Sequence, residues 1–167
     1  KNENNKMIIK MKNLIITILF LIISCSKFEM VPTTAEEIMN EVKSRKKSKA
    51  VLLNIWATTC APCVAEFPMI INIDRENNDL DVIFVSTDFN EDQNKAISFL
   101  ESQGMKNFSY IKNQKDQKFI NGIHQEWSGA LPFTIVFGKD DGEVVDFWEG
   151  KEPKSRFTRA ISLAIKN

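Results

Sequence analysis

The stretch of sequence that decides the fold is Ala50-Val51-Leu52-Leu53-Asn54-Ile55-Trp56-Ala57-Thr58-Thr59-Cys60-Ala61-Pro62-Cys63. Its first half is an almost unbroken apolar run, which predicts a buried strand over residues 50–56. The residues from Cys60 onward are typical of a helix, and Pro62 is compatible with the first turn of such a helix. The strand therefore places Cys60 at a helix N-terminus, where the partial positive charge of the backbone favours a thiolate over a thiol.

Cys60 and Cys63 together are the candidate reactive group. Residues three apart lie on the same helix face, so the two side chains are close enough to form a disulfide. Such a pair can attack the disulfide of another protein and then resolve the mixed disulfide, which makes dithiol–disulfide exchange our leading hypothesis. A structural zinc site is a weaker alternative, because zinc takes four ligands and the only other Cys and His residues are Cys25 and His124. A purely structural disulfide is weaker still, because so small a loop constrains the unfolded chain little.

The N-terminal part of the chain predicts export. Residues 14–23 form an apolar run that is too short to span a bilayer and has the length of a signal-peptide core. The run ends in Ile22-Ile23-Ser24-Cys25, which resembles a bacterial lipobox, so we expect residues 1–24 to be a signal peptide and Cys25 to be acylated after cleavage. Residues 25–32 would be the lipidated cysteine and a tether. The protein would then be a membrane-anchored lipoprotein facing the periplasm or the cell exterior, where thiols tend to be oxidised.

Residues 33–167 predict one α/β domain. Helical and strand patterns alternate and then end in a hairpin and a helix, which favours a central mixed β-sheet with helices on both faces. The expected helices cover residues 34–42, 60–73, 90 to a stop at 104, and 153 onward; the expected strands cover residues 50–56, 81–86, 108–111, 133–137 and 143–148. The 22 Lys and Arg residues balance the 22 Asp and Glu residues, so the composition indicates neither nucleic-acid binding nor a strongly charged partner surface. We interpret the basic segment 44–49 as a solvated loop.

Two segments carry a resemblance to a known family. The first is Asn54-Ile55-Trp56-Ala57-Thr58-Thr59-Cys60-Ala61-Pro62-Cys63-Val64-Ala65-Glu66-Phe67-Pro68, and the second is Gly129-Ala130-Leu131-Pro132-Phe133-Thr134. Together with the order of the elements, they resemble the thioredoxin fold and, more narrowly, the exported TlpA/ResA-like thiol–disulfide oxidoreductases, many of which serve cytochrome c maturation. The position before the first cysteine is usually aromatic in that family and is Thr59 here.

The resemblance implies a role for each residue of the site. Cys60 would be the exposed nucleophile and Cys63 the shielded resolving thiol. Pro132 would be a cis-proline facing the disulfide, and the backbone of Leu131 would pair with an extended substrate strand. Trp56 would pack beneath the active site and complete the substrate-binding set. The family chemistry implies neither a cofactor nor a metal.

Asn54 and Glu66 are the residues that bear on proton transfer. Ordinary thioredoxins have a buried aspartate at the position of Asn54, which helps to move protons off the resolving cysteine. Asn54 does not titrate, and in the TlpA/ResA-like branch a glutamate at the position of Glu66 is the candidate replacement. Glu66 lies three residues past Cys63 on one helix face, and burial would raise the pKa of its carboxyl toward the useful range.

The expected function is the reduction of disulfides in exported proteins. The partners would be protein thiols and disulfides and a membrane electron donor of the DsbD/CcdA type, and the protein would act as a monomer that binds no nucleic acid. Two alternatives remain open. A disulfide oxidase or isomerase would use the same residues with the electrons flowing the other way. A copper-binding chaperone of thioredoxin-like fold would use the two cysteines and His124, the only histidine in the chain.

Overall fold

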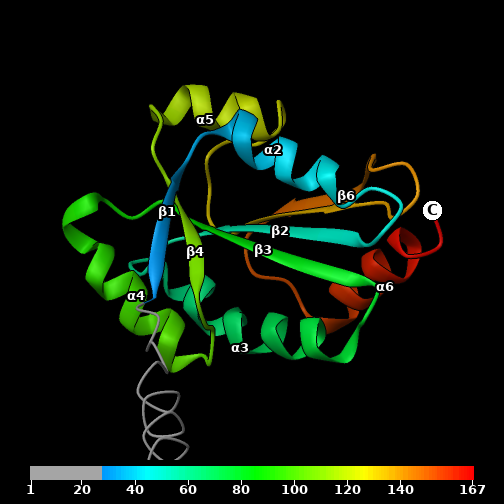
Figure 1. The fold of residues 1–167 in the computed structure, drawn as a ribbon, viewed down its shortest axis with the longest axis horizontal. Coiled ribbons are helices and arrows are strands. Elements are labelled where there is room, and N and C mark those ends of the chain that lie inside the picture. The colour runs from blue at the N-terminus through cyan, green and yellow to red at the C-terminus, as the bar shows by residue number, and fades with distance from the viewer. Residues whose placement is uncertain (1–27) are drawn as a thin grey trace, which may run out of the picture.

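The computed structural model describes residues 28–167, which form a six-stranded β-sheet. The strand order across the sheet is β1-β4-β3-β2-β5-β6 (Figure 1). The strands are β1 (Glu29–Thr33), β2 (Ala50–Trp56), β3 (Leu80–Ser86), β4 (Phe108–Lys112), β5 (Phe133–Phe137) and β6 (Val144–Glu149). β1 to β4 are parallel to one another, whereas β5 pairs antiparallel with β2 and with β6. The predicted α/β class with a mixed sheet is confirmed; the predicted signal peptide and Cys25 lie outside the described residues.

Five α-helices cover the two faces of this sheet within residues 28–167. They are α2 (Ala35–Ser44), α3 (Ala61–Glu76), α4 (Gln93–Ser102), α5 (Asp116–Ile123) and α6 (Lys154–Ala164). α3, α4 and α6 pack on one face, in a hydrophobic cluster that includes Phe67, Leu100 and Phe157. α2 and α5 pack on the other face, around Ile38 and Phe119, and lie above the sheet in Figure 1. None of the described helices is both long and apolar enough to cross a lipid bilayer.

β2 is the central strand and is buried along its whole length. Side chains alternate between the two faces of a strand. Leu52 and Trp56 accordingly belong to the hydrophobic cluster that contains α3, whereas Leu53 and Ile55 belong to the cluster on the opposite face. Asn54 has the same parity as Leu52 and Trp56, so its polar side chain lies in the core beneath α3. The predicted strand, turn and helix around the two cysteines are confirmed.

The domain begins earlier than the sequence analysis predicts. The tether expected over residues 25–32 is wrong in its second half, because Glu29–Thr33 forms β1 and pairs in parallel with β4. Phe28 and Met30 are buried in the same cluster as α3 and α4. The strand is hard to recognise because it contains Pro32, which is tolerated in a strand at the edge of a sheet, where one side of the backbone makes no ladder hydrogen bonds.

Helix α5 is an element that the sequence analysis does not predict. It buries Phe119 and Ile123 one turn apart and contacts α2. Its pattern is weak because the helix is short and contains Gly122, a poor helix former. The glycine has a packing reason: a Cβ at this position would lie 2.6 Å from the Cβ of Ala35 in α2. Gly122 therefore allows the two helices to pack closely, although glycine lowers the intrinsic stability of a helix.

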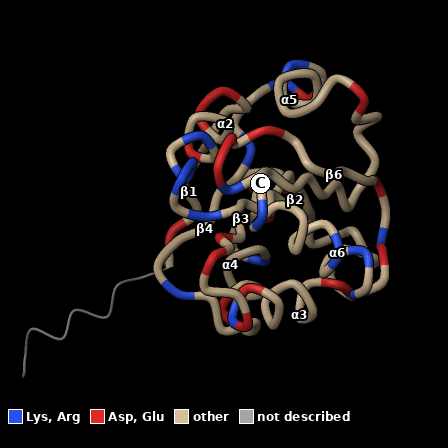
Figure 2. Tube along the Cα trace, turned by 90° about the vertical axis from the view of Figure 1, so that its right-hand side faces the viewer, with Lys and Arg blue, Asp and Glu red and all other residues tan. Residues whose placement is uncertain are grey.

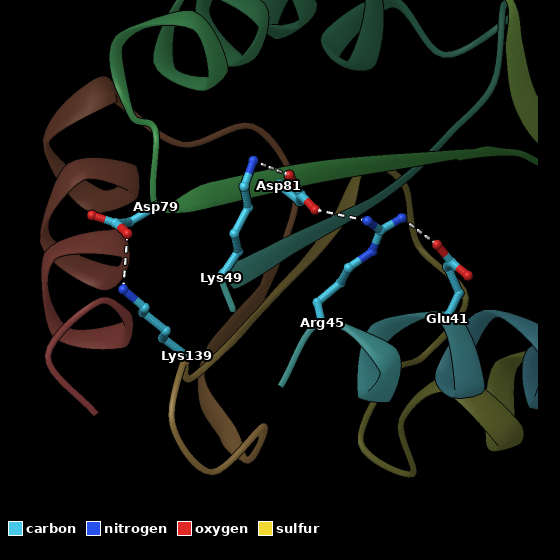
Figure 3. Close-up of polar contacts among 6 residues, drawn as sticks. All are labelled: Glu41, Arg45, Lys49, Asp79, Asp81 and Lys139. Atoms are coloured by element: carbon cyan, nitrogen blue, oxygen red, sulfur yellow. Dashed lines mark hydrogen bonds and ion pairs between the residues drawn. The ribbon is translucent and has the colours of Figure 1, made fainter. Parts of the chain in front are cut away.

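Charged side chains at the amino ends of β2 and β3 form ion pairs. The residues involved are Glu41, Arg45, Lys49, Asp79, Asp81 and Lys139 (Figure 3). Asp81 pairs with Lys49 at 2.7 Å and with Arg45 at 3.3 Å, so the solvated loop 44–49 is anchored to the start of β3. Lys139, which follows β5, pairs with Asp79 at 2.8 Å. Elsewhere along the trace basic and acidic residues are interspersed (Figure 2).

Candidate active site

Cys60 and Cys63 are joined by a disulfide at the N-terminus of α3, with their Cα atoms 5.3 Å apart. Cys60 is the N-cap residue of the helix, and its Sγ accepts a hydrogen bond from the backbone N–H of Cys63 at 3.3 Å. The side chain of Cys60 is partly exposed, whereas Cys63 is only 1% exposed. A thiol or disulfide arriving from solvent therefore reaches the sulfur of Cys60 first.

Asp88, in the loop after β3, fixes the turn that leads to Cys60. Its carboxylate accepts hydrogen bonds from the backbone N–H of Thr58 at 3.0 Å and from the hydroxyl of Thr58 at 2.7 Å. The hydroxyl of Ser86 donates to the same carboxylate at 2.7 Å, and Asp88 is only 8% exposed. Hydrogen bonds to a charged acceptor are among the stronger ones in proteins, so this group holds the turn in one position.

Glu66 lies in α3 beyond Cys63 and is 1% exposed. The side-chain amide of Asn54 donates to Glu66 Oε1 at 3.2 Å and to the hydroxyl oxygen of Thr134 at 3.0 Å. The other carboxyl oxygen, Oε2, is buried and has no hydrogen-bond partner within residues 28–167. A buried carboxylate with one unpartnered oxygen is costly when charged, so this arrangement favours the protonated form.

Burial raises the pKa of the Glu66 carboxyl to about 7. The loss of hydration is the largest cause, and it outweighs the hydrogen bond from Asn54, which favours the charged form. The loop after β6 contributes smaller effects: the charge of Lys151 and the nearby backbone of Glu152 lower the pKa, and the charge of Glu152 raises it. The Glu152 backbone does not reach hydrogen-bond geometry with the carboxyl. A carboxyl with this pKa can accept and release a proton near neutral pH.

The loop before β5 lies at the same edge of the sheet as the disulfide. Ile55 pairs with Phe133 in the ladder between β2 and β5, so the residues just before Phe133 lie beside the end of β2. The Leu131–Pro132 peptide bond is cis, as the resemblance implies, and Pro132 is buried. Within residues 28–167, neither the backbone N–H nor the backbone C=O of Leu131 has a hydrogen-bond partner. This backbone is therefore available to an extended segment of another chain.

Trp56 does not belong to the substrate-binding surface. Its side chain is 0% exposed, and its ring centroid lies 5.1 Å from those of Phe67 and Phe99. The prediction that Trp56 binds substrate is wrong, because a ring buried in this aromatic cluster cannot be reached from outside. It fills the core between β2 and the helices α3 and α4.

His124, the residue that a copper site would need, is engaged in local contacts. Its ring lies 4.1 Å from that of Phe147, measured between centroids, and its Nδ1 accepts a hydrogen bond from the backbone N–H of Glu126 at 3.3 Å. In the part of the chain that the structure describes, no three or more His, Cys, Asp or Glu side chains are grouped so that they could hold a metal ion.

Two further residues of this site, Asp88 and Thr134, have no role predicted from the sequence, although Thr134 ends the second segment that carries the resemblance. Asp88 comes directly after a strand parallel to β2, and polar residues at the carboxyl ends of neighbouring parallel strands meet at one edge of a sheet. That rule is the signal that identifies Asp88. Thr134 is brought to Asn54 by the antiparallel pairing of β2 with β5, where the two residues are direct partners. The sequence pattern of a hairpin does not show which residues of β2 and β5 are partners. The contact of Thr134 with Asn54 therefore had no comparable signal in the sequence.

The sequence matches the model of the family described as Redoxin over residues 27–161. It is 34% identical over 117 residues to the thiol-disulfide oxidoreductase ResA of Bacillus subtilis (strain 168). The aligned region covers 70% of this chain and 62% of that protein. It is 30% identical over 112 residues to ResA of Bacillus thuringiensis (strain Al Hakam), covering 66% of this chain and 60% of that protein. The chain thus matches 60% to 62% of the length of these two relatives.

A solved structure shows the same fold. The thiol:disulfide interchange protein of the thioredoxin family from Chlorobium tepidum TLS matches with a TM-score of 0.58 at 20% identity, over 73% of this chain and 83% of that chain. The predicted thioredoxin-like fold is therefore confirmed. The family match includes both cysteines, Glu66 and the loop with the cis peptide bond, so it covers every residue from which the site is built. The chain belongs to the Redoxin family.

Proposed function

We propose that this protein is a thiol–disulfide oxidoreductase that reduces disulfides in other proteins, with Cys60 and Cys63 as its redox pair. The main support is the disulfide at the N-terminus of α3, in which one sulfur is partly exposed and the other is buried. This difference assigns separate tasks to the two cysteines. The similarity to proteins named as thiol-disulfide oxidoreductases agrees with the proposal.

The exchange proceeds in two steps when the pair is reduced. The Cys60 thiolate attacks one sulfur of a substrate disulfide, so that a mixed disulfide forms and the other substrate sulfur leaves as a thiolate that takes up a proton. Cys63, having released its own proton, then attacks the Sγ of Cys60, and the first substrate sulfur leaves in turn. The substrate gains two electrons and the protein loses two. A separate dithiol donor must then reduce the Cys60–Cys63 disulfide.

Glu66 is the group that we assign to the proton of Cys63. Asn54 donates to one carboxyl oxygen, and the other, Oε2, has no partner in the part of the chain that the structure describes. A general base works best when its pKa is near the working pH, and burial raises the pKa of Glu66 to about 7. Glu66 therefore accepts the proton when Cys63 becomes a nucleophile and returns it when the disulfide is reduced again.

The direction of electron flow follows from the residues between the cysteines. A strongly oxidising pair needs a reduced form that is stabilised, chiefly as a thiolate. Ala61 and Pro62 carry no charge that could stabilise the Cys60 thiolate. This favours the reducing direction over the oxidase or isomerase alternative.

We further propose that the protein acts outside the cytoplasm as a lipoprotein, with residues 1–24 as a signal peptide and Cys25 as the acylated residue. The support is the apolar run followed by Ser24 and Cys25. A membrane donor of the DsbD/CcdA type would supply the electrons, and cytochrome c maturation is one pathway that such a protein serves. Incorporation of a labelled fatty acid that is lost in Cys25→Ser, and kept in Cys60→Ser, tests the anchor.

The reduction potential of the Cys60–Cys63 pair tests the proposed function. The protein is equilibrated with glutathione and dithiothreitol buffers, and the reduced fraction is read from alkylation of the free thiols. We expect a value near or below the roughly −270 mV of thioredoxin. A value near the roughly −120 mV of DsbA would reverse the direction of electron flow. The absence of a reversible couple would contradict the oxidoreductase assignment altogether.

A further inference from the structure

A cavity of about 200 Å³ opens beside the loop that holds Leu131. It lies between that loop, the loop after β3 and helix α5, and its apolar walls are formed by Phe119, Ile120, Trp127 and Leu131. Lys112 and Asp116 also line it, but they form an ion pair with each other at 2.5 Å. The charges at the cavity thus compensate one another, and its apolar walls are suited to an uncharged group that also tolerates polar neighbours.

Phe89 stands at this cavity and is 74% exposed. It lines the cavity together with the apolar side chains of Phe119, Ile120, Trp127 and Leu131, and a contiguous apolar surface, unlike a single exposed side chain, indicates a place where another molecule binds. Phe89 follows Asp88, whose carboxylate is bonded to Thr58, two residues before Cys60. The hydrogen bonds that fix the turn of the nucleophile therefore also fix the backbone beside Phe89.

Leu131 connects the cavity to the disulfide. Its side chain lines the cavity, and its backbone has no hydrogen-bond partner within residues 28–167. It precedes Pro132 at the edge of the sheet where β2 ends and the turn to Cys60 begins. A chain segment that pairs with the backbone of Leu131 therefore lies beside the cavity and at the edge of the sheet that holds the disulfide.

The size of the cavity limits what it can hold. Pockets for drug-sized ligands and cofactors measure roughly 300–1,000 Å³. An apolar cavity of roughly 150 Å³ is enough for benzene. The volume of about 200 Å³ therefore fits one aromatic ring and is smaller than the usual range for a cofactor pocket.

We propose that this cavity binds one aromatic side chain of the substrate polypeptide, close in sequence to the cysteine that Cys60 attacks. The inference rests on the proposed function, because it assigns a specificity site to the same exchange reaction. In recognition of an extended strand, main-chain hydrogen bonds supply affinity and side-chain pockets supply specificity. Leu131 supplies the main-chain partner and Phe89 one wall of the pocket. The preferred substrates are extended protein segments with an aromatic residue a few positions from a disulfide-bonded cysteine.

A set of peptide disulfides tests this inference. Each peptide has one cysteine in a Gly and Ser background, bonded to 2-mercaptoethanol, and Phe or Ala is placed in turn at each of the positions around the cysteine. The rate constant of reduction by the reduced protein is measured for the wild type, Phe89→Ala and Phe108→Ala. Phe108 is the matched control, because it is also an exposed phenylalanine, 48% exposed, and it lies at the opposite end of β4 from Lys112. Hydroxyethyl disulfide, which has no side chain for the cavity, reports exchange at Cys60 in the wild type.

We expect the Phe peptide to react about tenfold faster than the Ala peptide at one position, in the wild type and in Phe108→Ala. In Phe89→Ala the ratio of the two rates should fall to about threefold or less. Equal rates for Phe and Ala peptides at every position, with hydroxyethyl disulfide still reduced, would overturn the aromatic site and leave the proposed function intact. A ratio that is unchanged in Phe89→Ala would also overturn it. Failure to reduce even hydroxyethyl disulfide would overturn the proposed function, and this inference with it.

Discussion

Charged side chains have different surroundings at the two ends of β2 and β3: they are exposed and paired at one end, and buried near the other. At the amino ends, Asp81 pairs with Lys49 and Arg45, and these side chains remain between 24% and 42% exposed (Figure 3). At the carboxyl ends, Glu66 is 1% exposed, and among residues 28–167 its Oε2 has no hydrogen-bond partner. Paired surface charges anchor a loop, whereas a buried acid with an unpartnered oxygen has a perturbed pKa, which is common at functional sites.

The pKa values of Asp79, at the amino end, and Glu66, near the disulfide, shift in opposite directions. Hydrogen bonding to Lys139 lowers the pKa of Asp79, whereas burial raises that of Glu66 to about 7. For Glu66 the raised value carries a cost in stability. The contribution of this group is fully present below its unfolded pKa of 4.5 and is lost as the pH rises through about 7, an effect on the order of 3 kcal/mol. The active-site end is therefore less stable at neutral pH than it would be with a neutral side chain.

The largest effect is expected from the cysteines themselves. Cys60→Ser removes the nucleophile, so the rate of disulfide reduction should fall by more than about 10³-fold. Cys63→Ser keeps the first attack and removes the second, so a mixed disulfide with the substrate should accumulate. Mass spectrometry of the non-reduced protein detects that adduct, and circular dichroism verifies that both variants are folded. Substantial exchange by Cys60→Ser would contradict the site.

The second largest effect is expected from Glu66, the buried acid near the disulfide. Glu66→Gln keeps the shape and removes the titrating group, so reduction at pH 7 should slow by about 10²-fold. If Glu66 accepts the proton of Cys63, the wild-type rate should show a rise centred near pH 7 that Glu66→Gln lacks, beside the rise that both proteins show as the Cys60 thiolate forms. Glu76→Gln is the matched control in the same helix, since Glu76 is exposed and forms a surface ion pair with Lys154. A wild-type pH profile in Glu66→Gln would show that Glu66 is not the proton carrier.

A smaller effect is expected from Asp88, which is buried at the active-site end but fully hydrogen-bonded. Asp88→Asn weakens the bonds to Thr58 and Ser86 and should lower the free energy of unfolding by about 1–3 kcal/mol. Because Asp88 positions the turn before Cys60, the rate of alkylation of Cys60 should change as well. Urea unfolding and iodoacetamide kinetics measure the two effects. Asp92→Asn, at an ion pair with Lys95 on the surface, is the control and should change neither quantity appreciably.

The smallest effect is expected at the amino ends of the strands. Asp81→Asn breaks the pairs with Lys49 and Arg45 and should cost at most about 1 kcal/mol, less at high salt. The reduction potential should not change, because these residues lie at the other edge of the sheet from the disulfide. Urea unfolding at two salt concentrations tests the first statement. A decrease of more than about 2 kcal/mol in the free energy of unfolding would mean that these ion pairs contribute more to stability than surface pairs usually do.

The part of the fold that could be predicted from sequence is the part with local signals. The apolar run of β2 and the cysteines after it define strand, turn and helix within one short stretch. β1 and α5 are not predicted because both depend on contacts with elements that are distant in the sequence. β1 forms only where β4 offers a partner, and α5 depends on the contact of Gly122 with Ala35 in another helix.

The candidate site divides in the same way. The cysteines can be found from spacing, and Glu66 from its place in the helix, but its burial depends on the packing of α3 over Asn54 and on the loop after β6. Thr134 reaches Asn54 only through the register of two antiparallel strands. A sequence pattern gives the period of a strand and not the residue that lies opposite, so these contacts require the structure.

The most direct test of the contrast between the two ends is one titration of the side-chain carboxyl groups by NMR, in the oxidised protein with ¹³C-labelled Glu and Asp. We predict that the Glu66 carboxyl titrates near pH 7, while that of Asp79 titrates below its ordinary range. The Glu66 resonance is assigned by its loss in Glu66→Gln. A Glu66 midpoint near the ordinary value of 4.5 would contradict the account, because Glu66 would then be charged at neutral pH, as Asp79 is.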